Sequence, residues 1–254
     1  MTAPTAPTLA APAGRRWRAQ TRIELVLTLR RGESILLTFA IPMVLLAFFS
    51  LVDVLPTGTD DPIDFLLPGV LALAVMSTAL VSVAIATGFE RQMGVLKRLG
   101  STPLSRGQLL GAKTAAVVVI EVLQIIVLAI EGMLLGFRFS GPSIGAAVLA
   151  AVLATIAFAG LGLLMAGTLP ALTTLAAANG VYLVLLLLGG SLFPLERLPG
   201  PLEAFARLLP AAALTEALDG ALSAAGTVPG SSWLVLAAWA VVAPAAAAAT
   251  FRWE

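Results

Sequence analysis

Long apolar stretches dominate the chain and predict an all-α integral membrane protein. A membrane-spanning helix needs about 20 mostly apolar residues, and the sequence contains six stretches of about that length. The predicted transmembrane helices are residues 34–52, 65–88, 114–136, 144–168, 171–193 and 231–250. The segments between them are too short for a separate soluble domain, so residues 15–254 are expected to form one transmembrane domain.

The residues before the first span divide into two parts. Residues 1–14 are rich in Thr, Ala and Pro without any core-forming pattern, which indicates a disordered tail. In residues 15–31, arginines alternate with apolar side chains such as Trp17 and Ile23. This pattern is typical of an amphipathic helix in the membrane interface, with its arginines on lipid phosphates. The alternative is that the arginines only fix the topology.

Composition agrees with a membrane location and excludes much catalytic chemistry. The chain is 59% hydrophobic and 11% charged, against about 25% charged residues in soluble domains. It has no histidine and no cysteine, which excludes disulfides, thiolate metal sites and Ser-His or Cys-His nucleophiles. We therefore expect no catalytic residues and no metal site, and the net charge of +1 gives no reason to expect nucleic acid as a partner.

The distribution of charge predicts the orientation in the membrane. Lys and Arg gather at residues 15–31 and 91–113, whereas residues 53–64 carry only acids and residues 196–219 carry more acids than bases. The positive-inside rule places the two basic segments in the cytoplasm. Six spans then put both termini on the cytoplasmic side.

The basic segment between the second and third spans carries a distinctive pattern. Residues 90–105 read Glu-Arg-Gln-Met-Gly-Val-Leu-Lys-Arg-Leu-Gly-Ser-Thr-Pro-Leu-Ser. Met93, Leu96 and Leu99 recur at a helical interval, so a short amphipathic helix is expected to end near Gly100. Thr102-Pro103 is interpreted as an N-cap with the first helical residue, and Ser105 with Gln108 as a capping box.

The spacing Glu-x-x-x-Gly-x-Leu-x-x-Leu-x-x-Thr-Pro-Leu-Ser resembles the loop after the second span in ABC type-2 transporter permeases. The likeness is to bacterial multidrug or lipid exporter subunits of the daunorubicin-resistance type. It implies a coupling helix that seats on an ATP-binding subunit, although Val95 and Lys97 depart from the usual pattern. The alternative is a basic loop that only fixes topology. The implied coupling residues are Glu90, Arg91, Met93, Gly94, Leu96, Lys97, Arg98, Leu99, Thr102 and Pro103.

The resemblance also implies partners and a location. The permease would work with two copies of an ATP-binding subunit, which would hold ATP and Mg, so no cofactor is expected on this chain. A second permease subunit, identical or paralogous, would complete the path for a drug-like or lipid-like cargo. The Ala- and Arg-rich composition points to a bacterial plasma membrane, with lipid around the spans.

The segment between the fifth and sixth spans predicts two short re-entrant helices. Phe193, Pro194 and Leu195 break the chain, and then Leu202, Phe205 and Leu209 recur at helical spacing up to Pro210. These helices are too brief to span a membrane. The element resembles the extracellular gate of the same exporters, and the alternative is an amphipathic surface loop.

Three polar residues interrupt the third span. Glu121, Gln124 and Glu131 lie on one side of the predicted helix. An acid within a membrane helix usually faces a bundle interior or a water-filled path. They would therefore line the substrate path or a dimer interface, or they would form an internal hydrogen-bond network.

Other functions are weighed against the exporter. A proton-coupled secondary transporter would use Glu121 and Glu131 as a relay, but the chain shows no internal repeat. An intramembrane enzyme is disfavoured because His and Cys are missing. A scaffold subunit is the remaining alternative.

Overall fold

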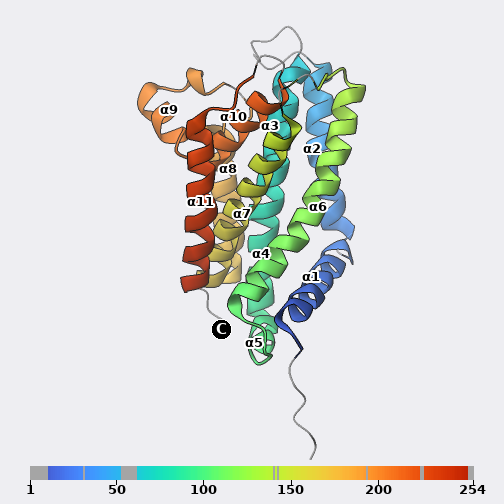
Figure 1. Ribbon diagram of the computed structural model, residues 1–254, viewed down its shortest axis with the longest axis vertical. Coiled ribbons are helices and arrows are strands. Elements are labelled where there is room, and N and C mark those ends of the chain that lie inside the picture. Colours follow the sequence, from blue (N-terminus) through green and yellow to red (C-terminus); the bar gives the residue numbers. More distant parts are fainter. Residues whose placement is uncertain are drawn as a thin grey trace, which may run out of the picture.

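The fold is a bundle of helices (Figure 1). The computed structural model describes residues 11–30, 32–52, 62–139, 141, 143–192, 194–223 and 226–250, and gives no side-chain detail for residues 33 and 34. All the regular elements within these ranges are helices. The all-α prediction is confirmed for this part of the chain.

The longest elements account for the predicted spans. Two helices, α1 and α2, precede a continuous second span made of α3, the π-helix η1 and α4, and α6, α7, α8 and α11 follow. Their bounds are α1 (Ala13–Arg30), α2 (Gly32–Leu51), α3 (Pro62–Met76), η1 (Ser77–Ser82), α4 (Val83–Gln92), α6 (Arg106–Leu134), α7 (Ile144–Thr168), α8 (Ala171–Leu188) and α11 (Gly230–Thr250).

Five of these helical stretches are long and apolar enough to cross a membrane, and a sixth span is obtained when α1 and α2 are counted together. The axes of Ala13–Arg30 and Ile35–Leu51 make an angle of 67°. The described residues therefore give five to six candidate spans, against the six that the hydropathy pattern predicts. Helix α6 begins at Arg106, before the apolar span predicted from residue 114, and this start agrees with the capping box predicted at Ser105.

Short helices connect the spans at both ends of the bundle. The connection between the second span and α6 contains α5 (Val95–Gly100). The connection between α8 and α11 contains η2 (Leu195–Arg197), α9 (Gly200–Ala206) and α10 (Pro210–Leu222). In Figure 1, α1 and α5 lie at one end of the bundle, and α9 and α10 lie at the opposite end.

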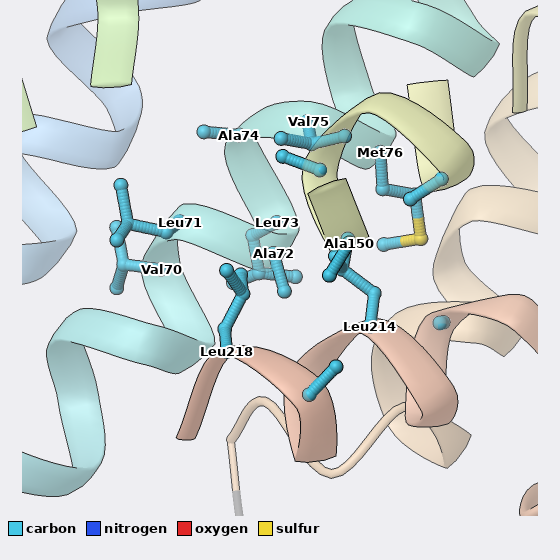
Figure 2. Close-up of a cluster of buried hydrophobic side chains, with 14 of the residues drawn as sticks. Val70, Leu71, Ala72, Leu73, Ala74, Val75, Met76, Ala150, Leu214 and Leu218 are labelled. Carbon is cyan, nitrogen blue, oxygen red and sulfur yellow. The ribbon is translucent and has the colours of Figure 1, made fainter. Parts of the chain in front are cut away.

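The centre of the bundle is α3. Almost every side chain from Ile63 to Met76 is buried, and the helix packs against α7 and α10. Figure 2 shows Leu214 and Leu218 of α10 and Ala150 of α7 against the α3 side chains. Since lipid tails are as apolar as these side chains, close packing rather than the hydrophobic effect holds such helices together.

Small residues let the backbones of neighbouring helices approach closely. A Cβ atom built on Gly160 of α7 would lie 2.6 Å from the Pro244 backbone nitrogen of α11. A Cβ on Gly162 would lie 2.7 Å from the Leu80 carbonyl oxygen of η1. The glycines of α7 therefore fix its contacts with both α11 and the second span.

Some predicted features lie outside the described residues. They include residues 1–10 of the predicted tail, Arg31, the acidic residues 53–61, and the C-terminal residues 251–254. The N-terminal helix is described and begins at Ala13, two residues before the predicted start at residue 15.

Candidate functional site

The predicted coupling segment is divided between two helices. The second span continues to Gln92, so Glu90 and Arg91 belong to the last turn of α4. Met93 caps this helix, and Gly94 adopts a left-handed φ of 70°, which glycine tolerates and other residues rarely adopt. The chain then turns into α5.

The side chains of α5 divide into a buried contact and an exposed face. Leu96 is completely buried in a small apolar cluster with Leu109 and Leu110 of α6. Lys97 and Arg98 are exposed, and Met93 just before the helix is 61% exposed. The segment from Met93 to Arg98 is therefore anchored by Leu96 and presents a basic surface with one methionine.

The turn after α5 differs from the prediction in one respect. Thr102-Pro103 was expected to begin the next helix, but α6 begins at Arg106 with Ser105 as its N-cap. Thr102 instead closes α5, because its hydroxyl donates to the Leu99 carbonyl at 2.6 Å. The predicted capping box between Ser105 and Gln108 is confirmed.

Helix α1 lies along this turn and along the start of α6. The Arg16 guanidinium donates to the Pro103 carbonyl, and the Gln108 amide donates to the Ala13 carbonyl at 3.4 Å. The indole of Trp17 lies against Gly111, where an added Cβ would lie 3.3 Å from the indole nitrogen. The N-terminal helix is thereby joined to the predicted coupling segment.

A buried cluster of charges joins α1, α4 and α6. The Lys113 ammonium of α6 lies 2.6 Å from Glu90 Oε2 and 2.9 Å from Glu24 Oε2. Gln20 of α1 donates to the other oxygen of Glu24 at 2.7 Å. All four residues are at most 8% exposed. Glu90 points inward to Lys113, so it does not contribute to the exposed surface next to α5.

The sequence pattern did not reveal this cluster. Lys113 was placed in the cytoplasmic loop, although α6 begins early enough to make it a buried helical residue. Glu24 was not singled out. The available signal was that Glu24 is the one acid between Arg15 and Arg31 in the sequence, since a lone acid in a basic helix suggests a specific partner.

The polar residues of α6 lie inside the bundle of this single chain. Gln124 is 1% exposed, accepts a hydrogen bond from the Thr78 hydroxyl of η1 at 3.0 Å, and donates to the Thr38 carbonyl of α2 at 2.8 Å. Glu121 is 3% exposed, and its Oε2 lies 2.5 Å from the Thr155 hydroxyl of α7. These two side chains connect α6 to three neighbouring helical segments.

Glu131 differs from the two inner polar residues. It is partly exposed near the end of α6. Glu131 Oε2 and Glu121 Oε1 both have no hydrogen-bond partner among the described residues. The structure therefore places Glu121 and Gln124 in the bundle interior and leaves Glu131 apart from them.

An arginine organises the predicted gate at the other end of the bundle. Arg207 follows α9 and contacts three acids: Glu203 of α9 at 2.9 Å, Glu196 of η2 at 3.3 Å, and Glu216 of α10. The hydrogen bond with Glu203 and the neighbouring carboxylates raise the pKa of Arg207 above its usual value, so its charge is permanent. The Ser232 hydroxyl of α11 donates to Glu216 at 2.9 Å.

The apolar residues predicted for the gate have different environments. Leu195 is buried, Pro194 and Leu209 are half-buried, whereas Leu202 and Phe205 are exposed. Phe193 lies outside the described residues. The expected apolar face of α9 therefore lies mostly on the surface. The short helices are joined by a buried cluster of Leu195, Ala206 and Ala212 and by the polar contacts of Arg207, which the sequence pattern did not single out.

The described residues contain no group of three or more acids, histidines or cysteines arranged to hold a metal ion. Buried polar groups in this part of the chain make contacts at the α5 end, in the interior, and between Ser191 and Thr215 of α10.

The fold is that of a polytopic membrane protein. A family model described as ABC-2 type transporter matches residues 15–222. The chain therefore belongs to the ABC-2 type transporter family, and it is a permease component of an ABC transporter embedded in the membrane. The family implies association with an ATP-binding subunit and a dimeric permease. A search among curated proteins gives no match.

The buried charge cluster gives a first prediction. Replacing Lys113 by Met leaves Glu24 and Glu90 buried without their shared partner, and removing one partner of a buried ion pair costs about 3–5 kcal/mol. We expect Lys113→Met to lower the free energy of unfolding by about that amount in a denaturation series in detergent.

The matched control is Lys97→Met, which removes an exposed lysine from the neighbouring helix and should change the stability little. The triple variant with Lys113→Met, Glu24→Gln and Glu90→Gln should recover part of the loss, because the two buried carboxylates that Lys113 neutralises are removed with it. A Lys113→Met variant as stable as the Lys97→Met variant would contradict the role of the cluster.

Proposed function

We propose that the chain is the permease subunit of an ATP-driven exporter that moves a hydrophobic or amphipathic cargo out of the cytoplasm or the inner leaflet. The observation that carries this proposal is the exposed segment around α5 and its attachment to the membrane-spanning helices. Lys113 joins the end of α4 to α1 and α6 by buried ion pairs, so a displacement of α5 is transmitted directly to the spans.

The proposed mechanism is alternating access by rigid-body motion. Two copies of an ATP-binding subunit hold ATP and Mg and close on each other. Their closure displaces the segment from Met93 to Arg98, and α1, α4 and α6 follow. A second permease subunit, identical or paralogous, forms the other half of the path in a bacterial plasma membrane, with both termini in the cytoplasm.

The extracellular gate in this proposal consists of η2, α9 and α10. The Arg207 contacts support it, since one guanidinium holds all three short helices and the Glu216 contact extends to Ser232 at the start of α11. Opening the gate requires some of these exchangeable contacts to break, which is less costly at an exposed site than in the bundle interior.

For the interior residues, the contacts favour the internal network over the substrate path. Gln124 and Glu121 are almost fully buried within one subunit and hydrogen-bonded to other helices of the same chain. We propose that they hold the spans in register. Of the three residues, Glu131 alone is partly exposed and available for contact with a cargo or a second subunit.

Arg98→Glu tests the coupling proposal. The side chain is exposed on α5, so reversing its charge should leave insertion and thermal stability unchanged. Because it alters the surface offered to the ATP-binding subunit, we expect cargo-stimulated ATPase activity and export to fall at least tenfold while basal ATPase activity persists. The measurement is ATP hydrolysis and transport by the reconstituted complex.

Arg98→Lys retains the positive charge and should retain most of the coupling. Normal coupling in the Arg98→Glu variant would contradict the assignment of α5.

The secondary-transporter alternative makes the opposite prediction for energy supply: export would collapse with an uncoupler at constant ATP, whereas the exporter proposed here should continue.

Arg207→Gln tests the gate proposal. The substitution removes the common partner of Glu196, Glu203 and Glu216. We expect faster backbone hydrogen exchange in residues 195–209 and reduced export, with little change in melting temperature because the arginine is exposed. Arg197→Gln, at an exposed arginine of η2, is the control and should exchange like the unmodified chain. Unchanged exchange in Arg207→Gln would exclude this arginine as the organiser of the gate.

A further inference from the structure

One carbonyl in the last turn of α7 lacks its usual helical donor. Leu169 ends the helix in an extended conformation with a ψ of 152°, which a residue before proline prefers. The Ala166 carbonyl would normally accept from the N–H of residue 170, four positions later, but this residue is proline and has no N–H. Ala166 is completely buried, so the carbonyl needs a partner from within the protein.

Arg91 supplies the missing hydrogen bond. Its Nη1 donates to the Ala166 carbonyl oxygen at 2.9 Å. Arg91 is half-buried in the last turn of α4, and α4 packs against α7. A positive charge at this position also suits the partial negative charge at the C-terminal end of a helix. One side chain of the predicted coupling segment therefore completes the end of α7.

Other carbonyls at this end of α7 have local donors. The Thr168 hydroxyl donates to the Leu164 carbonyl at 2.7 Å within the same helix. The Thr174 hydroxyl of α8, the next helix along the chain, donates to the Leu169 carbonyl at 3.2 Å. Unlike these contacts, the Arg91 contact joins α7 to the second span.

The opposite end of α7 contacts a helix of the proposed gate. Ser143, the N-cap of α7, donates its backbone N–H to the Ala221 carbonyl of α10 at 3.4 Å. Gly141 lies so close to the same carbonyl that an added Cβ would overlap with it. Helix α7 therefore connects the Arg91 contact with the proposed gate.

Moving the end of α4 away from α7 would break the Arg91 contact. The Ala166 carbonyl would then be left without a donor, because Pro170 cannot supply one, and an unpaired buried carbonyl is unfavourable. Hydrogen bonds from charged donors are also stronger than those between neutral groups. The contact therefore favours the arrangement in which α4 and α7 lie together and opposes displacement of the predicted coupling segment.

We propose that Arg91 is a releasable latch. Its hydrogen bond to Ala166 holds α7 against the second span, and closure of the ATP-binding subunits releases it by drawing α4 away together with α5. The inference rests on the proposed export function, since it names the contact that opposes the displacement of α5. Arg91 is in this sense a positioning residue, which acts through α7 and sets how readily the permease leaves this conformation without ATP.

The latch is tested first in the full chain without ATP-binding subunits. Spin labels at Ser101→Cys and Thr168→Cys, both exposed, report the distance between the end of α5 and the end of α7 in phosphatidylcholine nanodiscs. Displaced molecules are those outside the main distance peak of the parent chain. Arg91→Met keeps a long side chain but has no donor, and we expect the ratio of displaced to undisplaced molecules to rise about tenfold, as for the loss of a hydrogen bond from a charged group.

Two further variants make the result specific. Arg91→Lys retains a charged donor for a single carbonyl and should stay within about twofold of the parent ratio. Arg106→Met removes an exposed arginine at the same end of the bundle and is the matched control, with no expected change. The melting temperature of each variant is measured as well. A lower melting temperature in Arg91→Met without a displaced population would show that the arginine only stabilises the fold, and it would overturn the latch.

The second readout is ATP hydrolysis by the complex. Without the latch, displacement of α4 costs less before cargo arrives, so Arg91→Met should raise basal hydrolysis several-fold and reduce its stimulation by cargo. Loss of a surface that only contacts the ATP-binding subunit would not raise basal hydrolysis. A fall in basal hydrolysis in Arg91→Met would therefore count against the latch.

The outcomes distinguish the latch from the export proposal, because the distances are measured without nucleotide. An unchanged distance distribution in Arg91→Met would overturn the latch even in a complex that exports with ATP. A displaced population in Arg91→Met that Arg91→Lys reverses would support it. That result in a chain that couples to no ATPase would overturn the exporter and leave the Arg91 contact as the restraint on α7.

Discussion

One buried ammonium between two carboxylates determines how the α5 end of the bundle is held together. Lys113 reaches Glu24 of α1 and Glu90 of α4 from its position in α6, so three helices distant in sequence meet at one side chain. Taking such charges out of water costs several kcal/mol each, and close pairing offsets that cost only while every partner is present. The ion pairs therefore fix the relative positions of α1, α4 and α6 rather than simply adding stability. Helix α5 connects α4 with α6 and is held in place by the same arrangement.

In the interior of the bundle, hydrogen bonds of neutral groups and close backbone packing determine which helices lie together. Without a hydrophobic driving force between helices in lipid, packing and hydrogen bonds decide which helices pair. Gln124 connects α6 with η1 and α2, and glycines of α7 bring its backbone against α11 and the second span. The gate end is different, because its Arg207 contacts are exposed and exchangeable. Buried polar contacts thus connect the helices at the α5 end and in the middle of the bundle, whereas the polar contacts around α9 are exposed.

Hydropathy and charge placement predicted the helical class, the spans and the capping box at Ser105, since these depend on local pattern. The apolar span was placed from residue 114 because residues 106–113 are more polar, although the capping box already placed a helix start at Ser105. Lys113 was therefore assigned to the cytoplasmic loop. Glu90 was predicted to be a coupling residue, and a single sequence gives no sign that Glu24 and Lys113 lie beside it. Pro170 marks a carbonyl of α7 without its helical donor, but nothing in composition or periodicity shows that Arg91 supplies the hydrogen bond, so only the folded chain reveals this contact.

The central claim is that α1 and the α5 segment move as one unit when ATP binds. The chain has no cysteine, so spin labels can be placed at chosen sites in the complex by Arg18→Cys, Ser101→Cys and Thr168→Cys. Electron spin resonance distances between positions 18 and 101 should stay constant between the ATP-free and ATP-trapped states, whereas those between 101 and 168 should change. A change between 18 and 101 as large as that between 101 and 168 would contradict the account.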